Sequence, residues 1–115
     1  MGNLKRWIEE QAGREPIEAA VIGSMGGDSD YDSYSGSEGV PNYAGHPRGR
    51  VLTWEEAAPH LDYGFDDGFG DAGCEAIWAW TATKVIAISK YDGSTEAYAL
   101  PRHPSCGTPR MAGGG

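Results

Sequence analysis

Regularly spaced carboxylates are the side chains of this sequence best suited to chemistry, and the first group is Asp28-Ser-Asp30-Tyr-Asp32. Carboxylates at alternate positions supply the hard oxygen ligands with which a calcium-binding loop begins. The match then fails, because Ser33 stands where such a loop needs glycine, and Glu38 is the eleventh residue of the loop instead of the twelfth. We therefore expect an exposed acidic loop here, predict no metal or cofactor, and keep calcium as an alternative.

Adjacent carboxylates could instead act as general acid and general base, as in glycoside hydrolysis. Asp66 and Asp67 are such neighbours, but they lie in a glycine-rich stretch that gives no sign of burial. Burial is what would raise a carboxyl pKa into the working range of a general acid. We therefore expect a protein that is not an enzyme, and a carboxylate-based hydrolase or metal-dependent enzyme stays open as an alternative.

The cysteines and histidines do not form a recognisable constellation. Cys74 and Cys106 lack the spacing of a zinc site, and in a chain without a secretory signal they favour two free thiols over a disulfide. A nucleophilic pair of either cysteine with His103 would need a proximity in space that the sequence does not indicate.

The charge of the chain is concentrated in its middle. Residues 28–71 carry ten acidic side chains against two arginines, so this segment holds the whole net charge of −8. Such a surface argues against direct phosphate binding and favours a basic protein partner, with the interleaved tyrosines as anchors. The predicted binding residues are Asp28, Asp30, Tyr31, Asp32, Tyr34, Glu38, Glu55, Glu56, Asp62, Tyr63, Asp66, Asp67 and Asp71.

A β-hairpin is the clearest of the elements that must position this segment. Asp92-Gly93 is typical of a two-residue type I′ turn, which pairs Tyr91 with Ser94 and, further along, Val85 with Leu100. Alternation then places one apolar set on a core face, namely Ile86, Ile88, Ala97 and Ala99. The other face carries Val85, Ala87, Tyr98 and Leu100, and is apolar at the base and polar toward the turn.

Further strands and two helices complete the expected fold. Residues 77–81 predict a strand with Trp78 and Trp80 on one face, and 17–22 predict a fourth strand beside it. Asn3 is a good N-cap for an N-terminal helix that ends at Gly13. A second, short helix begins with the capping box of Thr53 and Glu56 and ends near Leu61.

The predicted fold class is α+β. It comprises a small antiparallel sheet of three to four strands with a C-terminal three-stranded meander, the two helices and a long irregular acidic loop. We expect one domain over residues 1–106, with the irregular loop at 23–50, and a flexible tail over 107–115. The chain has no run of about 18 apolar residues and no signal-peptide core, so we expect a cytoplasmic protein.

In length, fold class and confined acidic stretches such as DSDYDS and FDDGFGD, the chain resembles the small acidic accessory proteins of phages, among them the anti-CRISPR inhibitors. The resemblance is one of class and transfers no individual residue. It implies an inhibitor in the cytoplasm of the host bacterium. Its carboxylates would mimic nucleic acid against the basic surface of a defence complex such as a CRISPR effector, without binding nucleic acid or membrane itself.

A second function in a different class stays open beside this one. A small adaptor or structural module would bind through an exposed sheet face bearing Val85, Tyr98 and Leu100, together with whichever tryptophan is exposed. Whether that face is covered separates this hypothesis from the acidic inhibitor.

Overall fold

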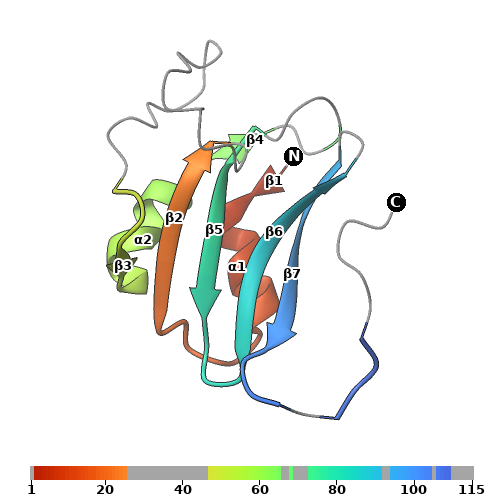
Figure 1. The fold of residues 1–115 in the computed structure, drawn as a ribbon. Coiled ribbons are helices and arrows are strands. Elements are labelled where there is room, and N and C mark those ends of the chain that lie inside the picture. Colours follow the sequence, from red (N-terminus) through yellow and green to blue (C-terminus); the bar gives the residue numbers. More distant parts are fainter. Residues whose placement is uncertain are drawn as a thin grey trace.

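The computed structural model describes residues 2–25, 47–65, 68, 73–91, 94–104 and 106–109. It confirms the α+β class, with a sheet backed by two helices (Figure 1). The elements in chain order are β1 (Gly2–Asn3), α1 (Leu4–Ala12), β2 (Ala19–Met25), β3 (Val51–Leu52), α2 (Trp54–Leu61), β4 (Gly64–Phe65), β5 (Glu75–Trp80), β6 (Lys84–Tyr91) and β7 (Ser94–Pro101). No helix of this described part is long and apolar enough to cross a membrane.

The main sheet has five strands in the order β3-β2-β5-β6-β7, and every neighbouring pair is antiparallel. The predicted hairpin register is confirmed from Tyr91↔Ser94 to Val85↔Leu100. The fifth strand is β3, whose two residues pair with Val21 and Ala20 of β2. A strand this short has too few residues for alternation to be visible in the sequence.

Strand β2 takes the place predicted for residues 17–22, but it begins and ends later. It pairs with β5 from Ala19↔Trp80 to Ile22↔Ile77, and an irregularity follows before Met25↔Glu75. The chain enters the strand at Glu18, whose backbone N–H donates to the carbonyl of Trp80 at 2.7 Å. The prediction of a strand beside the meander is therefore confirmed, with shifted boundaries.

Both helices begin at the predicted caps. The side chain of Asn3 accepts a hydrogen bond from the backbone N–H of Arg6 at 3.0 Å, and Gly13 ends α1 with a φ of 64°. In α2 the capping box is complete, because Thr53 Oγ1 accepts from the Glu56 backbone while Glu56 Oε1 accepts from the Thr53 backbone. These local bonds satisfy backbone donors that the first turn of a helix leaves unpaired.

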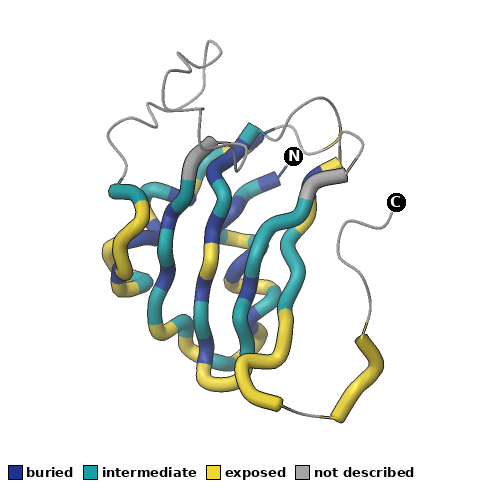
Figure 2. Tube along the Cα trace, viewed as in Figure 1, coloured by how far each residue is buried: buried dark blue, intermediate teal, exposed yellow. Residues whose placement is uncertain are grey.

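The core lies between the helices and one face of the sheet. Its buried side chains come from both helices, from β2 to β6 and from the residue before β5, and they are Leu4, Ile8, Ala12, Ala20, Ile22, Leu52, Ala57, Leu61, Phe65, Cys74, Ile77, Ala79 and Ile86. Figure 2 shows buried residues alternating with more exposed ones along β2, β5 and β6. One face of the sheet is therefore covered by α1 and α2.

A second, two-stranded sheet closes one end of this core. Strand β1 pairs with β4 through Gly2↔Phe65, and the ring of Trp7 meets Phe65 edge to face at 5.2 Å. A Cβ atom at position 2 would lie 2.6 Å from the Phe65 ring, so the close approach requires glycine.

The two edges of the main sheet are β3 and β7. Strand β3 has only two residues. On β7 the side-chain amide of Gln11 donates to the carbonyl of Ala97 at 3.5 Å. The strand ends at Pro101, which lacks an N–H group.

Candidate functional site

The structure describes four of the thirteen predicted binding residues. Glu55 and Glu56 lie exposed in the first turn of α2, Asp62 lies exposed at its C-cap, and Tyr63 follows half-buried. The other nine lie outside the described residues, and they are Asp28, Asp30, Tyr31, Asp32, Tyr34, Glu38, Asp66, Asp67 and Asp71. The described members therefore gather at the two ends of one helix.

Two of these three acidic side chains also hold the helices in place. Glu56 closes the capping box, and its hydrogen bonds with Thr53 lower the pKa of its carboxyl group. Asp62 accepts a hydrogen bond from the side-chain amide of Asn3 at 3.0 Å, which links the end of α2 to the start of α1. Their carboxylates are partly engaged inside the protein.

Tyr63 likewise makes internal contacts. Its hydroxyl group donates to Glu75 Oε1 at 3.3 Å and accepts from the Glu75 backbone N–H at 3.3 Å. Its ring lies 6.2 Å from that of Phe65, against the core. Tyr63 therefore helps to hold Glu75, the first residue of β5, in place.

Glu75 is a buried ionisable residue that the sequence analysis did not single out. Its side chain has no exposed surface, and burial raises the pKa of its carboxyl to about 8, although Arg48 and the Tyr63 hydroxyl favour the ionised form. Arg48 Nε lies 4.0 Å from Glu75 Oε2. Buried carboxyls of raised pKa are candidates for acid–base chemistry when a cleft exposes them. Glu75, Arg48 and Tyr63 do not line the hollow described below.

Metal ligands do not gather anywhere in the described part of the chain, where no group of three or more His, Cys, Asp or Glu side chains could hold an ion. Cys74 is buried and Cys106 is exposed, and the described residues contain no disulfide between them. Cys74 packs into the core beside Glu75 and is thus a small apolar residue of the interior.

The opposite face of the main sheet is the second candidate site, and we call it the outer face. The strand registers and the alternation of side chains show which positions face away from the helices. They are Val51, Ala19, Val21, Gly23, Ala76, Trp78, Trp80, Val85, Ala87, Ser89, Glu96, Tyr98 and Leu100. Within the described residues, the large apolar side chains that are exposed are Val51, Trp78 and Leu100, at 72%, 59% and 50%. All three belong to the outer face.

Neither described helix lies over the outer face. In Figure 1 both helices lie on the far side of the sheet, and the strands face the viewer. The tryptophans and Tyr98 add aromatic surface, and Glu96 is the one charged side chain among the described members of the face. The sequence analysis predicted this face from Val85, Tyr98 and Leu100. It missed Val51, whose contribution depends on the pairing of β3 with β2.

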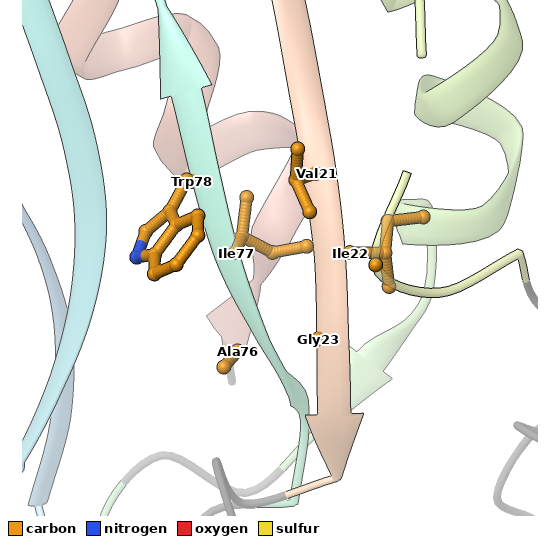
Figure 3. A pocket seen from close by; sticks show the side chains of 7 residues that line it. Val21, Ile22, Gly23, Ala76, Ile77 and Trp78 are labelled. Carbon is orange, nitrogen blue, oxygen red and sulfur yellow. The ribbon is translucent and has the colours of Figure 1, made fainter. Parts of the chain in front are cut away.

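A shallow hollow of about 220 Å³ opens in the outer face between β2 and β5. Its lining is apolar and consists of Val21, Ile22, Gly23, Gly49, Ala76, Ile77 and Trp78. Figure 3 shows the indole of Trp78 projecting from β5 at one side of this hollow. A Cβ atom at position 23 would lie 3.2 Å from the Cβ of Ala76, so any side chain at position 23 would crowd this part of the hollow.

Comparison with models of protein families, with curated proteins and with solved structures found no match to this chain. The fold and the site define it as a small α+β protein whose five-stranded sheet has one face packed on helices. The described residues leave the other, apolar face uncovered.

Proposed function

We propose that this chain is a non-enzymatic protein-binding module that docks through the outer face of its sheet. The observation that carries the proposal is the shared location of Val51, Trp78 and Leu100 on that face. Contiguous exposed apolar surface of this kind marks interaction sites, and tryptophan is the residue most often found at the energetic centre of an interface.

The dimensions of the outer face suit a protein partner. Four strands of six to eight residues and the short β3 cover roughly 500 Å² at the usual strand spacing and rise. A face of this extent matches the largest patches on typical monomers and is smaller than the roughly 800 Å² on one side of a standard interface, as suits a small or transient contact. Because Glu96 is its one charged member among the described residues, binding there should depend little on salt.

A second candidate function rests on the charge distribution. Residues 28–71 hold the whole net charge of −8, and exposed Glu55 belongs to this segment. Together with the resemblance to small phage inhibitors, this supports an acidic surface that binds the basic surface of a bacterial defence complex in the cytoplasm. Exposed charge pairs are screened, so that binding should weaken steeply as salt is raised.

One experiment separates the two functions. A tagged chain is used to recover partners from bacterial lysate at low and high salt, beside two variants of unchanged circular dichroism. The first variant, Trp78→Ser with Leu100→Ser, changes only the outer face. The second variant, Glu55→Gln with Asp66→Asn and Asp67→Asn, removes charge from the acidic segment.

The outer-face function predicts one specific protein that is recovered at both salt concentrations, lost with the first variant and retained with the second. A partner lost with the second variant and at high salt would support the acidic inhibitor instead. Equal recovery of every protein by all three chains would refute the acidic inhibitor and would refute a foreign partner for the outer face.

A further inference from the structure

We infer that the occupant of the outer face is a second copy of this chain, packed face to face. This inference rests on the proposed function, because it takes the outer face as the docking surface and names the partner. The outer face carries a projection and a hollow next to each other, and their shapes indicate the partner.

Trp78 is the projection and the hollow is its counterpart. The indole is 59% exposed, and it stands beside an apolar space of about 220 Å³ whose floor is Gly23 and Ala76. A buried apolar cavity of about 150 Å³ holds a benzene molecule, so this space has room for a bicyclic aromatic ring. The face therefore carries both a projecting aromatic ring and a hollow that can receive such a ring from another molecule.

In a dimer with two-fold symmetry, each Trp78 can enter the hollow of the other copy. Trp78 lies opposite Val21, and the hollow extends from this pair toward Gly23 and Ala76, about two residues further along the strands. Consider a two-fold axis that lies in the plane between the two stacked sheets, runs perpendicular to the strands and passes midway between Trp78 and the hollow. Rotation about this axis places the Trp78 of each copy over the hollow of the other. The two sheets then stack with their strands roughly aligned, which is the usual geometry of a β-sandwich.

Charge and area agree with self-association. Two copies that each carry a net charge of −8 repel each other, and the contact with the lowest repulsion is the one with the fewest charges. The outer face has that property, with Glu96 as its one charged side chain in the described strands. Two faces of roughly 500 Å² bury roughly 1,000 Å² in total, which is the size of a small, weak interface.

The test is the mass of the full chain in solution, measured by analytical ultracentrifugation and light scattering from about 1 µM to 1 mM. We expect twice the 12.2 kDa of one chain at the upper concentrations, with a dissociation constant in the micromolar range at both low and high salt. Fluorescence of the tryptophans should shift to shorter wavelength over the same concentrations, because Trp78 leaves water.

Three single variants test the contact itself. Trp78→Ala removes the projection and should raise the dissociation constant at least 30-fold, the lower bound for an interface hot spot. Ala76→Val fills the hollow without disfavouring the strand and should raise it at least about tenfold. Ala82→Val makes the same change at an exposed position in the turn between β5 and β6, outside the outer face, and should change it less than about threefold.

Each outcome decides the inference. A chain that stays monomeric to 1 mM overturns it, while a foreign partner lost with the outer-face variant would still support the proposed function. A dimer that tolerates Trp78→Ala uses another surface and also overturns it. Equal effects of Ala76→Val and Ala82→Val contradict the role of the hollow. Circular dichroism of each variant checks that a lower mass in solution comes from dissociation of the dimer and not from unfolding of the chain.

Discussion

Glu75 makes the stability of this protein depend on pH in the opposite sense to an ion-paired carboxylate. Burial raises the pKa of Glu75 from its ordinary value of 4.5 to about 8 in the folded protein. Between these two values the folded protein holds a proton that the unfolded chain has released. Raising the pH through this window therefore favours unfolding, and the stabilisation is fully present only below about 4.5.

The size of the effect follows from the two pKa values. Each pKa unit corresponds to about 1.4 kcal/mol, so a change from 4.5 to about 8 amounts to roughly 5 kcal/mol at high pH. Part of this stabilisation is already lost at pH 5. The free energy of unfolding should therefore fall by about 4 kcal/mol between pH 5 and pH 9. A domain of this size has a total stability on the order of 5–15 kcal/mol, so the loss is a large fraction of it.

The measurement is urea unfolding followed by tryptophan fluorescence and circular dichroism, at intervals from pH 5 to pH 9. The wild-type chain is compared with Glu75→Gln, which keeps the shape of the side chain but does not titrate. Glu55→Gln serves as the matched control, because Glu55 is exposed on α2. Subtracting the Glu75→Gln series removes the contribution of every other titrating group.

The expected result is a free energy of unfolding that falls with pH for wild type and Glu55→Gln, and falls far less for Glu75→Gln. The reasoning is refuted if wild type and Glu75→Gln lose the same stability from pH 5 to pH 9. That outcome would mean that Glu75 is ionised in the folded state and that Arg48 outweighs the effect of burial.

Three further predictions concern single contacts. Thr53→Ala removes a helix cap and should lower the free energy of unfolding by about 1 kcal/mol in urea titrations, whereas Thr108→Ala, at an exposed position after the last strand, should leave it nearly unchanged. Gly2→Ala drives a methyl group into the ring of Phe65 and should lower the thermal midpoint by several degrees in calorimetry, roughly as 1–3 kcal/mol of overpacking would. Glu15 accepts hydrogen bonds from two threonines that lower its pKa, so its stabilisation is lost as the pH falls, and Glu15→Gln should weaken the acid dependence of unfolding between pH 5 and pH 3.

Elements set by local chemistry could be predicted from the sequence. The Asp92-Gly93 dipeptide predicted the whole register of the hairpin, since a two-residue turn leaves one way to pair its flanks. The caps at Asn3, Gly13 and Thr53 were equally readable, because the groups that bond lie within four residues of one another.

Features that depend on distant segments could not be predicted. The burial of Glu75 results from its contacts with Tyr63 and Arg48, which reach it from other parts of the chain, and a glutamate at the start of a strand ordinarily faces water. The outer face was predicted only where the hairpin defines it. Val51 and the hollow become visible only when β3 and β5 are placed beside β2.

The two edge strands of the main sheet determine whether copies of this protein can pair edge to edge and form fibres. Strand β3 offers two residues, too few to template another strand, and on β7 the Gln11 amide already occupies the Ala97 carbonyl. Pro101, four residues beyond Ala97, has no N–H to present at the same edge. Strand-by-strand growth, the route to fibres, is therefore hindered at both ends of the sheet. The proposed contact between two copies across a two-fold axis closes at two, so it would cover the apolar surface without open-ended aggregation.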